Sequence, residues 1–296
     1  MAEINEIVVL SGKGGTGKTS LVGALAALVP DKVLCDADVD AADLHLLLNP
    51  QVLERHDFTA GHKAAIDPEQ CIQCGECLNW CRFHAISGDF VINPLLCEGC
   101  GVCFHLCPAE AVQFPDNHCG EWYISSTRFG SMVHARLGIA EENSGKLVTL
   151  VRQQARRLAE ENHQSFILTD GPPGIGCPVI SSLGNARAVL LVAEPTVSGK
   201  HDLERVAALA DHFHLPVLVL VNKADLHWEA AREIEQFCAG RGYPFLGHLP
   251  FDPDFTRAQV DGKTIMEYDN KRLQVLLTEV WEQLRSEIDN LTQKSH

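Results

Sequence analysis

The sequence has little basic charge for its length. Its 296 residues include 24 Lys and Arg against 39 Asp and Glu, which gives a formal net charge of −15. Proteins that bind nucleic acid through its phosphates depend on clustered Lys and Arg. The balance of charge therefore predicts no nucleic-acid partner.

Long apolar runs are missing too. No stretch approaches the roughly 20 apolar residues that a bilayer-spanning helix needs. The first residues, MAEINEIVVLSGKGG, lack the basic segment of a secretory signal. We therefore expect a cytoplasmic protein that does not associate with membranes.

Cysteine, by contrast, is abundant. Eight of the twelve cysteines lie in two runs with the spacing C-x2-C-x2-C-x3-C. Such short spacings suit metal or cluster ligation better than disulfides in a cytosolic chain. The runs are related by a repeat of 26 residues, which extends outside the cysteines because Ile66-Asp67-Pro68 recurs as Ile92-Asn93-Pro94. The repeat predicts two similar half-units packed together.

The two runs resemble those of bacterial two-cluster ferredoxins, in which the fourth cysteine of each run binds the other cluster. The resemblance implies two [4Fe–4S] clusters, one on Cys71, Cys74, Cys77 and Cys107 and one on Cys97, Cys100, Cys103 and Cys81. Zinc ribbons are the alternative, although they use paired C-x2-C knuckles. The chain departs from the ferredoxin pattern at Arg82, where a proline is usual, and we expect this arginine to place positive charge near the second cluster.

A glycine-rich loop follows the first strand-like run, and a helical run follows the loop. Residues 11–19 read SGKGGTGKT. Glycines let backbone N–H groups point at phosphate oxygens, and a helix N-terminus favours the same anion. We expect Lys18 to reach the β- and γ-phosphates and Thr19 to coordinate Mg²⁺. The predicted phosphate contacts are Gly12, Gly14, Gly15, Thr16, Gly17, Lys18, Thr19 and Ser20.

The early Lys13 makes this loop resemble the P-loop of the MinD/ParA/Mrp superfamily, to which nitrogenase iron protein is related. The resemblance covers nearly the whole chain. It implies a dimer that encloses two nucleotides, with Lys13 supplied to the partner's nucleotide. By position it also implies that Asp38 orients the attacking water, that Asp36 lies near Mg²⁺, and that Asp170 is a further carboxylate of the Mg²⁺ site. The implied catalytic set is Lys13, Lys18, Asp38 and Asp170.

The identity of the base depends on the sequence Asn222-Lys223-Ala224-Asp225. N-K-x-D reads guanine in many GTPases, because an aspartate accepts hydrogen bonds from guanine. In the family that the chain resembles, an Asn at this place contacts adenine instead, and a later loop lines the base. Here that loop is 249–253, and we favour ATP, with contacts from Asn222, Pro250 and Asp252.

Strands alternate with helices on both sides of the cysteine runs. Strand-like runs occur at 4–10, 32–36, 165–170, 188–193 and 217–222, and helical runs at 19–29, 147–162, 202–213, 228–240 and 270–291. This pattern predicts an α/β fold, a P-loop NTPase with a doubly wound, mostly parallel sheet. We divide the chain into a first part of the ATPase core (1–60), an inserted bacterial-ferredoxin-like α+β domain (61–118) and a second part of the core (119–296).

Two functions fit these features. The first is an ATP-hydrolysing homodimer, or heterodimer with a related ATPase, that couples the nucleotide state to electron transfer, or to metallocluster maturation, on a metalloprotein or redox partner. The alternative is an ATP-driven positioning or assembly protein of the MinD type, with structural or redox-sensing clusters. MinD attaches to membranes through a C-terminal amphipathic helix. Residues 270–296 carry four basic and four acidic side chains, so we expect the leucines of this helix to pack on the sheet instead.

Overall fold

The computed structural model describes residues 4–138, 141 and 144–294. The chain divides into two compact units. The larger unit consists of residues 1–56, 122–136 and 144–296, and the smaller unit of residues 57–121 and 137–143. The smaller unit contains the whole of the segment 61–118 in which the cysteine runs lie.

The described residues form a sheet of nine strands in the order β11-β10-β9-β1-β8-β2-β7-β6-β3. Parallel pairing joins its first seven members, β11 (Phe245–His248), β10 (Val217–Val221), β9 (Ala188–Ala193), β1 (Asn5–Leu10), β8 (Phe166–Asp170), β2 (Lys32–Asp36) and β7 (Gly130–Leu137). The predicted α/β fold with a mostly parallel sheet is therefore confirmed.

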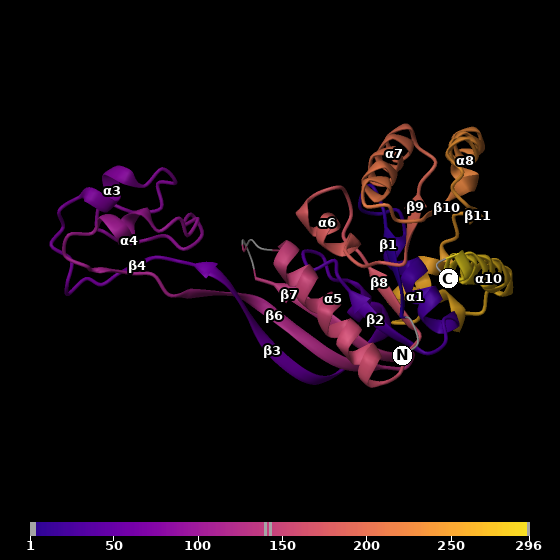
Figure 1. The fold of residues 1–296 in the computed structure, drawn as a ribbon, viewed down its shortest axis with the longest axis horizontal. Coiled ribbons are helices and arrows are strands. Elements are labelled where there is room, and N and C mark those ends of the chain that lie inside the picture. Colours follow the sequence, from indigo (N-terminus) through magenta and orange to yellow (C-terminus); the bar gives the residue numbers. More distant parts are fainter. Residues whose placement is uncertain (1–3, 139–140, 142–143, 295–296) are drawn as a thin grey trace. The chain divides into compact units, whose positions relative to one another are not determined.

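Helices cover both faces of the parallel strands (Figure 1). Side chains of β1 alternate between the faces, because Ile7 and Val9 belong to one apolar cluster while Val8 and Leu10 belong to the other. The first cluster includes α1 (Lys18–Leu28), α2 (Leu44–Leu48) and α10 (Lys271–Lys294). The second includes α6 (Cys177–Leu183), α7 (Val197–His212) and α8 (Trp228–Arg241). Helix α5 (Ser144–Glu161) packs on α6, β2 and β8.

The C-terminal helix α10 is part of the core. Leu273, Leu277, Leu284 and Ile288 are fully buried, and the ring of Trp281 meets the Phe166 ring edge-on at 5.7 Å. This confirms that the apolar side of the helix packs on the sheet. None of the described helices is long and apolar enough to cross a bilayer.

Three neighbouring strands of the sheet were not predicted from the sequence, and neither were β11 and the two short strands of the smaller unit. β3 (Gln51–His62), β6 (Asp116–Thr127) and β7 lie at one end of the sheet order, and a two-residue connection, Arg128–Phe129, joins β6 to β7. The Arg128 guanidinium fixes this connection: it pairs with the Glu267 carboxylate at 2.6 and 2.7 Å and donates to the carbonyls of Leu47 and Leu48. These contacts tie the connection to the end of α2.

In the smaller unit, the two copies of the 26-residue repeat have equivalent secondary structure. Helices α3 (Glu76–Trp80) and α4 (Val102–Leu106) occupy equivalent positions, and the strands β4 (Ala65–Ile66) and β5 (Val112–Gln113) pair with each other. Ile66 pairs with Val112, and the repeat-related Ile92 pairs with Ile86. The two halves therefore exchange equivalent backbone contacts, as the predicted packing of half-units requires.

Candidate functional sites

The glycine-rich loop connects β1 to α1 at the carboxyl end of the central strand, where ligands of parallel α/β sheets bind. Gly17 has a φ of +91°, and a Cβ placed on it would collide with the Asn222 side chain. The Asn222 amide donates to the carbonyl of Thr16 at 2.8 Å. Glycine is required at position 17 because both the backbone angle and the close approach of Asn222 exclude a side chain.

A pocket opens over this loop. Its lining includes the predicted contacts Gly14, Gly15, Thr16, Gly17, Lys18, Thr19, Ser20, Asp38, Asn222, Pro250 and Asp252. Four other predicted residues, Gly12, Lys13, Asp36 and Asp170, lie outside this lining. The structure thus brings most of the predicted nucleotide contacts around one space.

Beneath the loop, Lys18 lies among three buried carboxylates. Its ammonium group contacts the Asp170 carboxylate directly and lies 3.5 Å from Asp38 Oδ2. The Asp36 carboxylate accepts backbone N–H groups of Asp38 and Leu44. The exposed fractions of Lys18, Asp36 and Asp170 are only 6%, 0% and 1%. One lysine cannot neutralise three ionised carboxylates, so an added cation would balance the negative charge that remains.

The pKa values of these groups reflect that imbalance. Burial raises the pKa of Asp38 to about 6, with Lys18 opposing the rise and Asp170 adding to it. Burial, followed by the charge of Asp170, holds the pKa of Asp36 well above its ordinary value. Burial lowers the pKa of Lys18, but the charges of Asp170 and Asp38 outweigh it and leave the pKa raised.

The donor set at this position fits Mg²⁺. Oxygen ligands and negative charge are what this ion prefers. Asp170 Oδ2 is buried, and in the described part of the chain it has no hydrogen-bond partner. The Thr16 hydroxyl is in the same situation. Buried oxygens without partners are costly, and a hydrated cation would satisfy the carboxylate.

The other loop lysine has different surroundings. Lys13 is about one-third exposed and pairs with Glu194 at 3.0 Å. Lys223 pairs with the same carboxylate at 2.9 Å and donates to the carbonyl of Gly15. The two lysines hold the pKa of Glu194 below its ordinary value against the effect of its partial burial. Within one chain, Lys13 is thus held by Glu194.

The structure also bears on the base. Asp225, the residue that would read guanine, accepts the backbone N–H of Phe251 and is not among the residues lining the pocket. Asn222 and Phe251 do line it. One oxygen of Asp225 is thus engaged by the backbone, and the carboxylate lies outside the lining of the pocket, so this pocket gives no support to a guanine-reading role for Asp225.

The smaller unit contains two cavities ringed by cysteines. One is lined by Cys71, Cys74, Cys77 and Cys107, and the other by Cys81, Cys97, Cys100 and Cys103. Each set takes three cysteines from one run and the fourth from the other run. The remaining lining is largely apolar, including Ile66 and Val112 at the first cavity and Ile86 and Ile92 at the second.

We call Cys81 and Cys107 the crossing cysteines, because each belongs to one run but lines the cavity of the other run. Backbone N–H groups point at both. The N–H of Ala85 donates to Cys81 Sγ at 3.4 Å, and the repeat-related N–H of Ala111 donates to Cys107 Sγ at 3.3 Å. Such bonds stabilise thiolates and influence the potentials of iron–sulfur clusters. The two cysteine sets therefore fit a pair of cubane clusters in donor type and number.

Sequence reasoning missed several residues in and beside the nucleotide pocket. Lys223, which follows β10, lines the pocket together with Phe255, Thr256 and Gln259 of α9 (Asp254–Val260). Glu194, which follows β9, does not line it but pairs with Lys13 and Lys223. The positions of Glu194 and Lys223 after buried parallel strands could have revealed them, because such strand ends converge on the site. The α9 residues have no comparable signal.

A mostly parallel sheet, a glycine-rich loop on its central strand and a buried lysine–carboxylate group define a P-loop nucleotide-binding protein. The sequence matches the family described as the CobQ/CobB/MinD/ParA nucleotide binding domain over residues 7–265. The chain belongs to this family.

The chain is also similar to a relative of nearly the same length and shares its fold with solved structures. An "Uncharacterized protein MJ0578" of Methanocaldococcus jannaschii is 31% identical over 95% of this chain and 97% of its own length. The cell division ATPase MinD of Pyrococcus furiosus has a similar fold, with a TM-score of 0.59 at 18% identity, over 96% of this chain and 99% of that one. MinD of Pyrococcus horikoshii, solved with Mg-ADP, gives a TM-score of 0.58 at 18% identity, over 95% and 96%.

Proposed function

We propose that this protein is an ATP-driven switch of the MinD type: it binds MgATP, dimerises and hydrolyses the nucleotide, and its smaller unit carries two [4Fe–4S] clusters. The observation that carries the proposal is the group of Lys18, Asp38 and Asp170 beneath a pocket lined by the glycine-rich loop. This arrangement suits phosphoryl transfer, in which positioning and charge stabilisation supply most of the catalysis.

Each part of the site has a role in this proposal. Backbone N–H groups of the loop and Lys18 bind the phosphates, and Thr19 with the buried carboxylates holds Mg²⁺. The ion supplies neutralisation of the charge on the phosphates. Asp38, which lines the pocket, orients the water that attacks the terminal phosphate.

Dimerisation follows from Lys13. In the family that the chain resembles, this lysine reaches the nucleotide of the partner. In the single chain it pairs with Glu194, so we propose that it exchanges this carboxylate for phosphate oxygens when two copies, or this chain and a related ATPase, close over ATP.

The clusters would be held by Cys71, Cys74, Cys77 and Cys107 and by Cys97, Cys100, Cys103 and Cys81. When bound, such clusters accept and release single electrons. In the MinD-type proposal they stabilise the smaller unit or sense redox state. The likeness to MinD structures supports this version more than an electron-transfer function.

A second function is favoured by one observation, the crossing of the cysteine sets. Crossing places two clusters in one small unit, as in electron-transfer ferredoxins. In this function, ATP hydrolysis gates electron delivery to a metalloprotein partner, or maturation of its metal centre.

Anaerobic purification followed by two measurements tests the proposal. We expect about eight irons per chain, as two [4Fe–4S] clusters require, and Mg²⁺-dependent phosphate release from ATP that far exceeds release from GTP. An absence of ATP hydrolysis would refute the switch, and zinc in place of iron would refute the clusters. An ATPase rate that rises only when a redox partner is reduced would favour the second function.

A further inference from the structure

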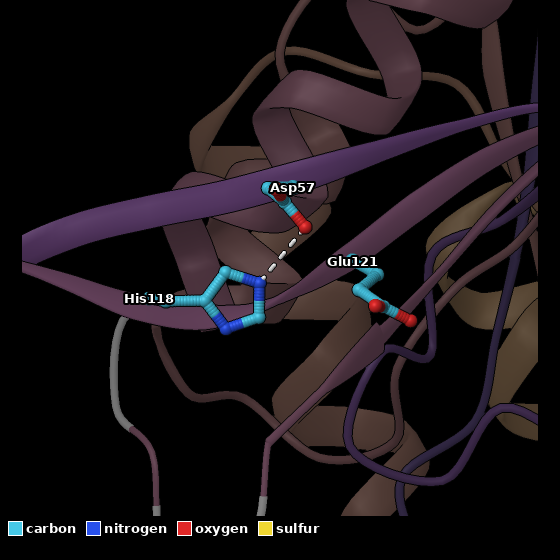
Figure 2. A group of neighbouring side chains, drawn as sticks. All are labelled: Asp57, His118 and Glu121. Atoms are coloured by element: carbon cyan, nitrogen blue, oxygen red, sulfur yellow. Dashed lines mark hydrogen bonds and ion pairs between the residues drawn. The ribbon is translucent and has the colours of Figure 1, made fainter.

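Three side chains of the smaller unit could together bind a metal ion outside the two sites described above. They are Asp57 of β3 and His118 and Glu121 of β6 (Figure 2). Each offers one ligand atom, and these atoms all lie within 4.8 Å of one another. His118 Nε2 lies 3.1 Å from Asp57 Oδ1, so the ring already faces the space that the donors share.

The three donors at this place are of kinds that bind cations. The two carboxylates come from neighbouring strands, and the His118 imidazole adds a nitrogen ligand. Because the donor atoms lie so close together, a single divalent ion could use all three.

The mixture of nitrogen and oxygen donors indicates which kind of metal ion could bind. Mg²⁺ and Ca²⁺ prefer oxygen ligands throughout, whereas imidazole with carboxylates suits first-row transition metals. Three protein ligands leave the remaining coordination positions to water, since Asp57 and His118 are 74% and 54% exposed.

We propose that Asp57, His118 and Glu121 form a binding site for a first-row divalent ion such as Zn²⁺. The chain passes from the larger to the smaller unit between His56 and Asp57 and returns between Glu121 and Trp122. A bound ion would therefore join β3 to β6 beside two of the places where the chain passes between the units. This inference is independent of the nucleotide and of the iron–sulfur clusters.

A matched histidine on the same two strands provides the control. His62 of β3 pairs with Asp116 of β6 at 3.2 Å, and their exposed fractions, 47% and 77%, resemble those of His118 and Asp57. The described residues include no third donor for that pair. A histidine–carboxylate pair alone would thus behave identically at the two places.

The experiment is isothermal titration of the full, cluster-loaded protein with Zn²⁺ under anaerobic conditions, with Mg²⁺ in excess to occupy the nucleotide site. We expect one saturable Zn²⁺ event that His118→Ala and Asp57→Asn each weaken by about tenfold or more, in the range that lost coordination support produces. His62→Ala should bind like the unmodified protein.

Two results would overturn the proposal. One is the absence of a saturable event in the unmodified protein. The other is an affinity that His118→Ala leaves unchanged, or that His62→Ala reduces equally. Iron content and the melting temperature without zinc show whether each variant is folded. Zinc that binds at cysteines outside the two cluster sets can be recognised, because neither histidine substitution changes its binding.

Discussion

The two lysines of the phosphate loop differ in what surrounds them, and this difference predicts different roles. Lys18 is almost fully buried against Asp170 and Asp38, whereas Lys13 is partly exposed and pairs with Glu194. A group buried within the site acts on every bound nucleotide. A group held at its edge can be exchanged when a second chain arrives.

We therefore expect Lys18→Ala to abolish both tight ATP binding and hydrolysis, and Lys13→Ala to keep binding while losing hydrolysis by about a hundredfold or more, the range seen when one charge-stabilising group is removed. Fluorescent-nucleotide binding and phosphate release measure the two effects separately. Glu194→Gln is the control for the ion pair alone and should bind ATP. Normal hydrolysis by Lys13→Ala would contradict the assigned role.

Asp38 should give the nucleotide-free protein a distinctive pH dependence. Its ordinary pKa is 3.8, and the folded protein raises it to about 6. Between about pH 4 and pH 6 the folded state keeps a proton that the unfolded state has lost, so the free energy of unfolding contributed by Asp38 falls as the pH rises through this window. At neutral pH the ionised carboxylate destabilises the fold by about 1–3 kcal/mol.

The substitution Asp38→Asn removes this titration. The melting temperature of the variant minus that of the unmodified protein should therefore be more positive at pH 7.5 than at pH 4, as calorimetry can measure. The pKa of about 6 for Asp38 already includes the attraction of Lys18, so the loss of that attraction in the variant does not change the sign of the expected difference. A difference that does not vary with pH would show that Asp38 is not the titrating group.

At the scale of elements, the crossing of the cysteine sets makes a prediction that pairs of substitutions can test. If Cys71 and Cys107 hold the same cluster, the double variant Cys71→Ser/Cys107→Ser loses that cluster and keeps the other. The variant Cys71→Ser/Cys81→Ser then damages both. Iron analysis and electron paramagnetic resonance of the reduced proteins should show about four irons and one signal in the first case, and fewer in the second. The reverse pattern would establish uncrossed clusters.

The elements that could be predicted from the sequence are those with strong local patterns. Short apolar runs bounded by loops predicted five of the seven parallel strands within one or two residues, as at 188–193, where predicted and observed bounds coincide. The strands β3, β6 and β7 were missed because their apolar residues are interrupted by charged and exposed ones, as in Gln51–His62. Their pairing depends on distant partners, which a local pattern does not record.

Residues of the candidate sites could likewise be predicted where they belong to a contiguous motif, and were missed where only the fold brings them together. The glycine loop and the cysteine runs are contiguous motifs, so their spacing, together with the families that they resemble, predicted which residues would gather there. The pairing of Glu194 with Lys13 and Lys223, and the α9 side of the pocket, arise from tertiary contacts between segments far apart in the chain. No short motif encodes such contacts.

At the scale of the whole molecule, the burial of α10 predicts that the protein does not bind membranes through this helix. Leu277 and Leu284 are fully buried and Trp281 nearly so, and a helix must expose its apolar side to bind a bilayer surface. We expect no more sedimentation with anionic vesicles in ATP than in ADP. Strong ATP-dependent co-sedimentation would show that membrane attachment belongs to the cycle.

Nucleotide-driven dimerisation is the remaining property of the whole molecule that the site predicts. Asp38→Asn should bind ATP but hydrolyse it slowly, because the attacking water loses the carboxylate that orients it. ATP should therefore hold this variant as a dimer with twice the mass of the 32.4-kDa chain, whereas ADP should leave it monomeric.

Light scattering after size-exclusion chromatography measures this change. The double variant Lys13→Ala/Asp38→Asn should bind ATP and remain monomeric, because the lysine that would reach the partner's nucleotide is absent. A dimer that forms equally with ADP, or one that survives the loss of Lys13, would separate dimerisation from the nucleotide state. It would then leave hydrolysis without the structural change that a switch requires.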